Sequence, residues 1–200
     1  EQFGYSAGVD HWTWWGPDAR LESLPLPALP GPFQIQNAAG VLMALRALGM
    51  RLPLTVQAIR DGLSQARIAG RFTVMPGTVE EIYDVAHNPH GAMALAAALA
   101  ARPCAGRTFA VCAMLADKDA SGVASALAAQ VQAWYLAGLD GLRGQSAQAL
   151  AARMPLPVDP RLHADPAGAL AAARADARPG DRIVIFGSFH TIAELLPPGL

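Results

Sequence analysis

The sequence is poor in cysteine, which excludes one large class of small proteins. Its 200 residues include only two cysteines, Cys104 and Cys112, too few for a disulfide scaffold. Cys112 lies within an apolar, strand-like run, so we expect a buried thiol there rather than a metal ligand. Cysteine therefore gives no sign of a disulfide-stabilised extracellular domain.

Long apolar runs and an excess of charge are also missing. No run approaches the roughly 20 residues that a membrane-spanning helix needs, and the Ala-rich stretch 91–101 ends at Arg102. No basic segment followed by an apolar one opens the chain, so no secretory signal is predicted. The net charge of −1 argues against a broad electrostatic attraction to nucleic acid or to anionic membranes. We expect a cytoplasmic protein with neither of these partners.

Glycine-rich phosphate loops are absent as well. Neither the dinucleotide-binding pattern nor the P-loop pattern occurs in the chain, so nucleotide binding in the usual Rossmann manner is not expected. Hydrophobic residues make up 52% of the sequence and charged residues 16%. The chain can therefore bury a substantial core, and we expect it to be globular.

Strand-like sequence begins almost at the first residue. Aromatic residues and turn residues fill the segment Gln2–Trp15, and a proline-rich turn region, 24–32, is predicted after it. Two amphipathic helices are predicted next, over 36–48 and 55–67, and Gly49 is a suitable stop signal for the first. Because strand sequence begins without an initiator methionine, we expect the chain to be a piece of a longer protein.

After Gly70 the pattern changes to strands that alternate with helices. Strands are predicted over 81–86, 107–115, 132–137, 158–163 and 182–187, and helices over 91–101, 119–130, 146–154, 166–177 and 191–196. Asp119 is the predicted N-cap of the second of these helices. Strands joined by helical crossovers must be parallel, and right-handed crossovers cover both faces of the sheet. We therefore predict an α/β fold with a doubly wound, mostly parallel sheet over residues 70–200, entered through a hinge-like segment at 70–77.

Nearly all the unusual polar residues follow predicted strands. They occur in four segments: 84–90, 116–119, 141–145 and 187–190. The carboxyl ends of parallel strands open on one edge of the sheet, where open α/β folds bind ligands. We expect the four segments to converge there, beside helix N-termini whose N–H groups favour anions.

Each residue in these segments also has a plain structural explanation. The carboxylate of Asp84 suits a ribose hydroxyl or a cation, and it equally suits a turn. Ser188 suits a carboxylate or phosphate and also a helix cap, whereas a nucleophilic serine would need the glycine two residues on that the hydrolase elbow uses. His87 and His90 lack the spacing of a zinc site, so no metal site is predicted.

Three further polar residues are equally open to two interpretations. Arg71 offers bidentate donors for phosphate or carboxylate, and otherwise is a surface arginine. Asn37, inside the first predicted helix, reads as a partly buried amide. Lys118 is the only lysine and is either a phosphate partner or a solvated charge. The aromatic cluster Trp12–Trp15 is interpreted as core packing.

Taken together, these segments resemble the C-terminal half of the folylpolyglutamate synthase family, especially its bacterial branch with both dihydrofolate and folylpolyglutamate synthase activity, within the Mur ligase superfamily. The matching segments, in the family's order, are Gln36–Ala39, Gly70–Phe72, Asp84–His90, Met114–Asp119 and Gly187–Thr191. The element Asp-Val-Ala-His-Asn-Pro-His is highly specific, and the resemblance covers essentially the whole chain.

The resemblance implies a Rossmann-like C-terminal domain of the Mur ligase type over 70–200, preceded by the tail of the central ATPase domain over 1–69. It also implies an ATP-dependent amide ligase that uses Mg²⁺. In such an enzyme ATP phosphorylates a carboxylate of dihydropteroate or of a reduced folate, and the amine of L-glutamate attacks the acyl phosphate to give an amide, ADP and phosphate. Holding two anions and a phosphoanhydride in line requires cations and pre-placed donors more than covalent catalysis.

The resemblance also implies roles for individual residues. Asn37, Arg71 and Asp84 match positions that contact ATP in the family, on the adenine, phosphate and ribose sides respectively. His87 and Ser188 match positions near the incoming glutamate. No catalytic residue is assigned.

Important parts of the family's active site lie upstream of this chain. These are the P-loop, a magnesium-binding acid and histidine, and a modified lysine. We therefore expect the protein ligands of Mg²⁺ in the missing N-terminal half, and expect the chain to be inactive alone. The complete enzyme is expected to be a monomer, whereas the exposed remnant of the central domain is expected to associate with another copy of this chain.

Some assignments stay open. The roles of Lys118 and His190 are not assigned. A muramyl-peptide-type ligase domain is an alternative that the segments 84–90 and 188–190 disfavour. A non-catalytic module that binds a nucleotide or an amino acid is a second alternative, and the missing P-loop favours it.

Overall fold

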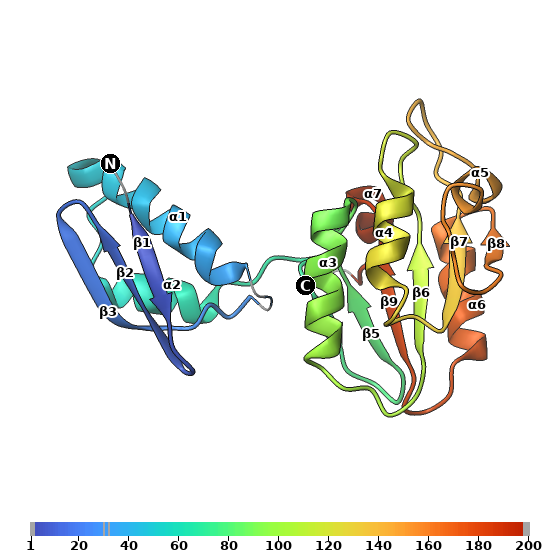
Figure 1. The fold of residues 1–200 in the computed structure, drawn as a ribbon, viewed down its shortest axis with the longest axis horizontal. Coiled ribbons are helices and arrows are strands. Elements are labelled where there is room, and N and C mark those ends of the chain that lie inside the picture. The colour runs from blue at the N-terminus through green and yellow to red at the C-terminus, as the bar shows by residue number, and fades with distance from the viewer. Residues whose placement is uncertain (1–2, 30, 32, 198–200) are drawn as a thin grey trace. The chain divides into compact units, whose positions relative to one another are not determined.

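A computed structural model describes residues 3–29, 31 and 33–197. The chain divides into two compact units, Glu1–Ile68 and Ala69–Leu200, which are coloured from blue to red along the chain in Figure 1. Each unit has a hydrophobic core of its own and is described by itself below.

The first unit combines a small antiparallel sheet with two helices. Its strands lie in the order β1-β2-β3 and are followed by α1, a short 3₁₀ turn η1 and α2. The bounds are β1 Gly4–Ala7, β2 His11–Gly16, β3 Ala19–Pro25, α1 Gln34–Leu48, η1 Gly49–Arg51 and α2 Val56–Gln65. Strand β3 was not predicted, and its last two residues, Leu24 and Pro25, lie within the turn region that was predicted over 24–32. Pro30 and Pro32 of that region lie outside the described residues.

Alternate residues of β2 supply the centre of this unit's core. Trp12 and Trp14 are buried and cluster with Leu24 and with buried residues of α1. The indole Nε1–H of Trp14 donates to the carbonyl of Ala39 at 3.1 Å, which satisfies the buried polar atom. Trp15 was wrongly predicted to be core; successive strand side chains point to opposite faces, and Trp15 is exposed.

The second unit is built on a six-stranded sheet in the order β4-β5-β9-β6-β7-β8. Strand β4 runs antiparallel to β5, and the other neighbouring strands are parallel, so the predicted α/β fold with a mostly parallel sheet is confirmed. The strands are β4 Thr73–Met75, β5 Glu80–Tyr83, β6 Thr108–Cys112, β7 Ala133–Ala137, β8 Arg161–His163 and β9 Arg182–Phe186. The helices are α3 Pro89–Ala100, α4 Ala120–Leu127, α5 Ala147–Ala151, α6 Pro166–Asp176 and α7 Phe189–Leu195.

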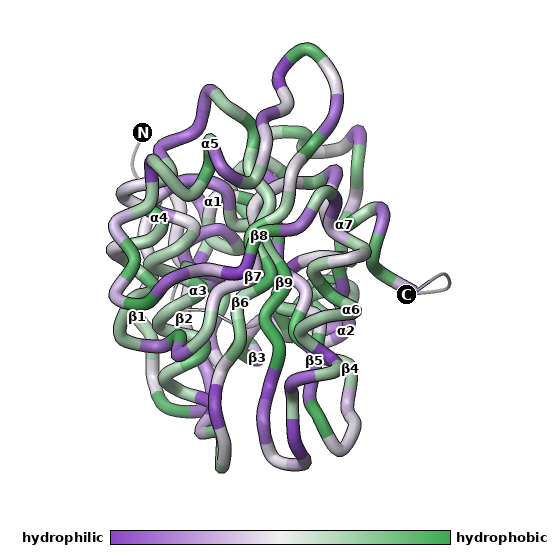
Figure 2. Tube along the Cα trace, turned by 90° about the vertical axis from the view of Figure 1, so that its right-hand side faces the viewer, coloured by the Kyte–Doolittle hydropathy of each residue, from purple (hydrophilic) through white to green (hydrophobic). Residues whose placement is uncertain are grey.

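Helices cover both faces of this sheet. Buried residues of α3, α4 and α5 cluster with one set of strand residues, and those of α6 and α7 cluster with the alternate set. In β9, for example, Val184 belongs to the first cluster and Ile185 to the second. Figure 2 shows the hydrophobic residues concentrated along the central strands β6 and β9, whose residues are all buried. A strand buried on both faces reads as a continuous apolar run.

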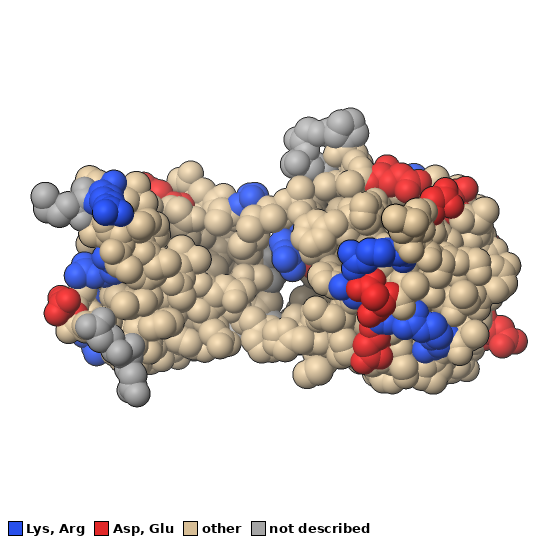
Figure 3. All heavy atoms as spheres, turned by 90° about the horizontal axis from the view of Figure 1, so that it is seen from above, with Lys and Arg blue, Asp and Glu red and all other residues tan. Residues whose placement is uncertain are grey.

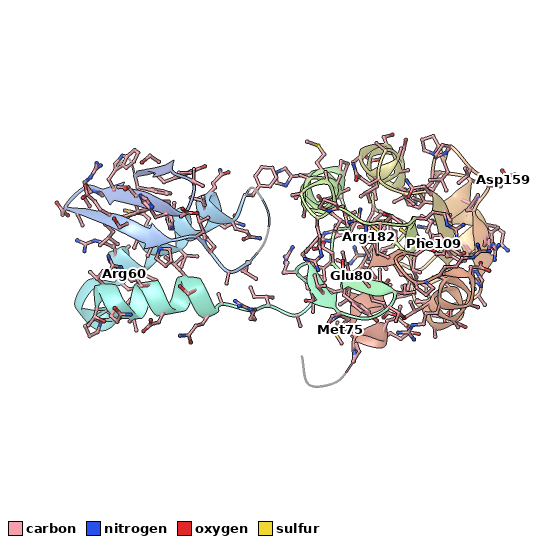
Figure 4. All side chains as sticks on the ribbon, turned by 90° about the horizontal axis from the view of Figure 1, so that it is seen from below. Arg60, Met75, Glu80, Phe109, Asp159 and Arg182 are labelled. Atoms are coloured by element: carbon pink, nitrogen blue, oxygen red, sulfur yellow. The ribbon has the colours of Figure 1, made fainter. Side chains whose placement is uncertain are left out.

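A buried arginine forms hydrogen bonds at the edge of the sheet where the strands begin. Arg182 donates to Thr108 Oγ1 at 2.8 Å and to the carbonyls of Leu99 and Arg102 at 3.2 and 2.6 Å, at the C-terminal end of α3. Burial lowers the pKa of Arg182 from its ordinary value. Glu80 pairs with Arg102, and Figure 4 labels Glu80 and Arg182 at this edge.

Several predicted details are confirmed and others are corrected. Asp119 accepts a hydrogen bond from Gly122 N at 2.9 Å as the N-cap of α4. Cys112 is buried, and this burial raises the pKa of its thiol. Strand β5 ends at Tyr83 instead of residue 86, because Val85 N leaves the sheet and donates to the Gly70 carbonyl at 2.8 Å. The segment predicted to be a hinge contains the edge strand β4.

Candidate functional site at the carboxyl edge of the sheet

The four polar segments that follow strands meet at one edge of the second unit, as predicted. The segment after β9 contacts the segment after β6, where Thr191 Oγ1 donates to the Ala113 carbonyl at 3.1 Å. The segment after β7 is joined to the segment after β6, where Ala116 N donates to the Arg143 carbonyl at 2.9 Å. Strand β9 leads to a helix on the face opposite to α3 and α4. Such a change of face between neighbouring strands is where open α/β sheets bind ligands.

Asp84 fixes the backbone at the end of β5. Its Oδ2 accepts a hydrogen bond from Phe72 N at 2.9 Å, and its Oδ1 accepts one from Ala86 N at 2.8 Å. Burial raises the pKa of this carboxyl above its ordinary value, and the two N–H groups and the Arg71 guanidinium oppose the rise. Each carboxylate oxygen keeps a second lone pair, so Asp84 can hold this turn and still accept a hydrogen bond from a ligand.

Arg71 lies in a tight turn that is pinned to Asp84. Its neighbours on either side, Gly70 and Phe72, have φ values of 74° and 48°. A Cβ at Gly70 would lie 2.9 Å from side-chain atoms of Val85 and Ile192, so this turn requires glycine. Arg71 is exposed, in agreement with the prediction of a surface arginine, and is close enough to lower the pKa of Asp84. The structure thus brings together a cation and an acid on one side of the edge.

His87 has a defined tautomer. Its Nδ1 lies 2.8 Å from the Val85 carbonyl oxygen, and since a carbonyl only accepts, Nδ1 carries the proton. In the neutral ring Nε2 is then the acceptor nitrogen. The ring also lies 6.4 Å from that of Phe189, between centroids. His87 therefore connects the β5 segment to the start of α7.

Ser188 is the N-cap of α7, which is the plain explanation considered for it. Its Oγ accepts from Thr191 N at 3.0 Å and lies 2.8 Å from Thr191 Oγ1. Because Thr191 Oγ1 donates to Ala113, the Ser188 hydroxyl must donate to Thr191. Ser188 is 3% exposed. Its hydroxyl is thus occupied within the protein and holds the start of α7 in place.

Glycine is required immediately before this cap. Gly187 has φ 118°, and a Cβ there would lie 2.4 Å from the Ala113 carbonyl oxygen. The backbone of the β9 segment can approach the end of β6 this closely only without a side chain.

A mixed charge cluster lies at the end of β6. Asp117 pairs with Arg143 at 2.7 Å and with Lys118 at 3.3 Å. The hydrogen bond from Arg143 is the main cause that lowers the pKa of Asp117 to about 2. Figure 3 looks onto this edge and shows acidic and basic side chains side by side on the larger unit. Lys118 is therefore an ion-paired side chain in this structure.

Two further side chains position this segment: Arg153, which sequence reasoning missed, and Gln145, which belongs to the predicted polar segment 141–145. Arg153 donates through Nη1 to the Ala116 carbonyl at 2.8 Å and through Nη2 to the Lys118 carbonyl. Gln145 donates to the Met114 carbonyl at 2.8 Å. Arg153 follows an Ala-rich helix and resembles any surface arginine in the sequence, so only the tertiary structure reveals its contacts.

Asn37 belongs to the first unit. It lies in the first turns of α1, and its Nδ2 donates to Gln34 Oε1 at 3.3 Å. It is exposed and not partly buried as the helix pattern had suggested. Its side chain is therefore accessible to solvent on the surface of this unit.

The part of the chain that the structure describes has neither a metal-binding cluster nor a membrane-spanning helix. Residues 3–29, 31 and 33–197 contain no group of three or more His, Cys, Asp or Glu side chains arranged to hold a metal ion. Within that same part of the chain, no helix combines the length and the apolar character needed to cross a membrane.

Comparison with known proteins assigns the second unit to a family. The family described as "Mur ligase, glutamate ligase domain" matches residues 70–189, which include β4 to β9 and every candidate residue of the sheet edge. The chain belongs to the Mur ligase family. The predicted resemblance is thereby confirmed.

Individual Mur ligase relatives narrow the comparison. The chain is 40% identical over 195 residues to the dihydrofolate synthase/folylpolyglutamate synthase of Escherichia coli. The aligned region covers 98% of this chain and 44% of that relative. The E. coli protein in complex with DHPP and ADP superposes with a TM-score of 0.82, over 96% of this chain and 44% of that one. A bifunctional folylpolyglutamate synthase/dihydrofolate synthase with Mn, AMPPNP and L-glutamate bound gives a TM-score of 0.83 at 38% identity, with the same coverage. The chain is thus homologous to the C-terminal portion of these ligases and spans less than half of their length.

Proposed function

We propose that the complete protein containing this chain is an ATP-dependent amide ligase that adds L-glutamate to dihydropteroate, to reduced folates, or to both. The observation that carries the proposal is the 40% identity over 195 residues to the E. coli dihydrofolate synthase/folylpolyglutamate synthase. The ligands of solved relatives, namely ADP, DHPP, AMPPNP and L-glutamate, fit such a reaction. Since the chain spans 44% of the E. coli relative, the activity is proposed for the complete protein.

We propose that residues 1–69 are the tail of the central ATP-binding domain and that residues 70–200 are the Rossmann-like glutamate ligase domain. The division of the chain between Ile68 and Ala69 and the family match over 70–189 support this proposal. Mg²⁺ is proposed as the metal that accompanies ATP, and a relative with bound Mn supports a divalent cation. Its protein ligands are proposed to lie in the portion of the ligase that this chain does not span.

Asn37, Arg71 and Asp84 are proposed to bind ATP. Arg71 is exposed and offers a planar fork of donors that suits phosphate oxygens. Asp84 has its position fixed by Phe72 N and Ala86 N and keeps lone pairs for the ribose hydroxyls. Asn37 is proposed on the adenine side, where an exposed amide can both donate and accept.

His87 and Ser188 are proposed to act near the incoming L-glutamate. The Nε2 of His87 is an acceptor that suits the ammonium or amine of an amino acid. The hydroxyl of Ser188 is engaged by Thr191, so its proposed contribution is to hold the backbone of its segment in place. Both residues lie on segments joined by the contact between His87 and Phe189.

In the proposed reaction ATP transfers its terminal phosphoryl group to the carboxylate of the folate acceptor, and ADP leaves. The amine of L-glutamate then attacks the acyl phosphate, an amide bond forms, and phosphate leaves. The residues of this chain contribute by holding anionic groups in place, which is the dominant requirement of phosphoryl transfer.

The proposal is tested by ADP release from the complete protein with ATP and Mg²⁺. We expect release that requires both L-glutamate and either dihydropteroate or a reduced folate. Release with a muramyl-peptide acceptor instead would support that branch of the family. Binding of ATP or glutamate without any ADP release would support the non-catalytic binding module and contradict the ligase.

A further inference from the structure

Phe189 is a large aromatic side chain left exposed beside the candidate glutamate site. It is the first residue of α7 and is 60% exposed, while Thr191 and Ile192 are the buried residues of this helix. Its ring lies 6.4 Å from that of His87, tilted by 50°. This separation is within the range of favourable aromatic pairs. The contact joins the segment after β5 to the segment after β9.

The backbone that carries Phe189 is held firmly. Ser188, the preceding residue, caps the helix through Thr191 N, and Thr191 Oγ1 donates to the Ala113 carbonyl at the end of β6. Gly187 lets the same segment lie against that carbonyl. Phe189 therefore projects from a support anchored to the central strands.

His87 is constrained by two different contacts. The hydrogen bond from Nδ1 to the Val85 carbonyl sets the tautomer, and the ring of Phe189 limits how the imidazole can turn. With both contacts in place, Nε2 is an acceptor of fixed direction. An amino-acid ammonium group has only donors to offer and matches such an acceptor.

We infer that Phe189 is a positioning residue that holds the His87 imidazole so that Nε2 meets the ammonium group of the incoming amino acid. The inference rests on the proposed glutamate ligase function and deepens it. Phe189 acts through His87, so its removal weakens the use of L-glutamate and spares the use of ATP.

The test is steady-state kinetics of the complete protein with Phe189→Leu and Phe189→Tyr. Loss of one aromatic contact corresponds to about a three- to tenfold rise in the KM for L-glutamate, and this rise is expected for Phe189→Leu with the KM for ATP unchanged. Phe189→Tyr keeps the ring and should retain the native KM. Met93→Ala is the matched control, because Met93 is also an exposed apolar residue of this unit, at 56%, and lies on α3.

A double-mutant cycle with His87→Ala separates positioning from a general structural effect. In the His87→Ala background, Phe189→Leu should cause no further rise in the KM for L-glutamate. Equal losses in both backgrounds, a parallel rise in the KM for ATP, or no effect of Phe189→Leu would each overturn the inference.

A nitrogen NMR measurement keeps this inference distinct from the proposed function. If the native complete protein shows no turnover, the ligase proposal fails. The imidazole resonances of His87 then still test whether Phe189 holds the His87 ring in position. Phe189→Leu should then shift or broaden the ring resonances of His87, because the imidazole is freer to turn, whereas Met93→Ala should leave them unchanged. His87 resonances unchanged by Phe189→Leu would refute the positioning role.

Discussion

At the scale of single residues, Asp84 shows how one side chain serves both structure and proposed function. Its two oxygens hold the backbone of the Arg71 turn and of the β5 exit, and they still have lone pairs for a ligand. This dual role could not be predicted from the sequence. Position after a strand singled out Asp84, but the bond to Phe72 N depends on a turn with two positive φ values.

Replacing Asp84 should therefore affect both ATP use and stability. In the complete protein, Asp84→Ala is expected to raise the KM for ATP about tenfold, the equivalent of one lost hydrogen bond to a charged group. It should also lower the free energy of unfolding by about 2 kcal/mol, because two backbone N–H groups lose their acceptor.

Asp165 supplies the control for this substitution. It caps α6 by accepting from Gly168 N at 2.7 Å, so Asp165→Ala should cost stability through a lost cap. Its KM for ATP should stay at the native value. An unchanged KM for ATP in Asp84→Ala would remove Asp84 from the nucleotide site.

The pKa values of Asp84 and Asp117 are shifted in opposite directions from the ordinary Asp value. Burial raises the pKa of Asp84, so the part of the folding stability that depends on protonation of Asp84 is fully present below the ordinary Asp pKa and is lost as pH rises through the raised value. The hydrogen bonds that its oxygens accept from Phe72 N and Ala86 N do not need that proton. The pKa of Asp117 is lowered to about 2, so its contribution is present above the ordinary value and is lost as pH falls toward 2. Carboxyl-carbon NMR of the chain measures both midpoints.

Arg143→Gln tests the cause of the second shift. It removes the main hydrogen bond to Asp117 and should move that midpoint up toward the ordinary value, while the midpoint of Asp84 stays in place. A midpoint of Asp117 that does not move would show that Arg143 is not its cause.

At the scale of elements, the helices and strands that have a regular hydrophobic pattern could be predicted from the sequence. Among the described residues of the second unit, the parallel strands and the helices lie within a few residues of their predicted bounds, because apolar runs and helix caps are local signals. Strand β3 was missed since a register shift opposite β2 and a positive φ at Ser23 interrupt its alternation. Strand β4 was missed because three residues carry no period.

The hydrogen bond that joins the start of α7 to the end of β6 could not be predicted from the sequence either. We call this contact between β6, β9 and α7 the joint. Helix caps such as Ser188 follow from the position of a serine before a helix, whereas the bond from Thr191 to Ala113 spans 78 residues of chain. The convergence of the four loops was nevertheless predicted, because parallel topology alone brings carboxyl ends together.

Removing the Thr191 hydroxyl should weaken this joint. Thr191→Val keeps the shape of a fully buried side chain. It leaves the Ala113 carbonyl without this donor and the Ser188 hydroxyl proton without its acceptor, while Ser188 Oγ still accepts from Thr191 N. A loss of about 1–3 kcal/mol in the free energy of unfolding is expected, seen as faster amide exchange in β6 and β9. Thr191→Ser keeps the hydroxyl and should lose less; an equal or greater loss would show that the methyl group, not the hydrogen bond, stabilises the joint.

At the scale of the whole molecule, exposed apolar residues are unevenly distributed. Of the 16 large hydrophobic side chains that are exposed in the described residues, 11 lie in the first unit, which is about a third of the chain. A part of a protein with many exposed apolar residues is a candidate for an interface. This uneven distribution fits the proposal that the first unit is part of a larger domain.

The isolated chain should therefore self-associate, while the complete protein should be a monomer. Sedimentation velocity over a range of concentrations is expected to show a concentration-dependent larger species for the chain. Val41→Ser, at a residue of α1 that is 56% exposed, should weaken it, and Val158→Ser in the second unit should not. A chain that stays monomeric at every concentration would contradict this expectation.

The central claim is that this chain is the C-terminal part of a glutamate ligase and carries half of its active site. The most direct test is mass spectrometry of dihydropteroate incubated with ATP, Mg²⁺ and L-glutamate, with either the complete protein or this 200-residue chain. The account predicts a glutamylated product from the complete protein and none from the chain alone. A product formed by the chain alone, or no product from the complete protein with either dihydropteroate or a reduced folate, would contradict it.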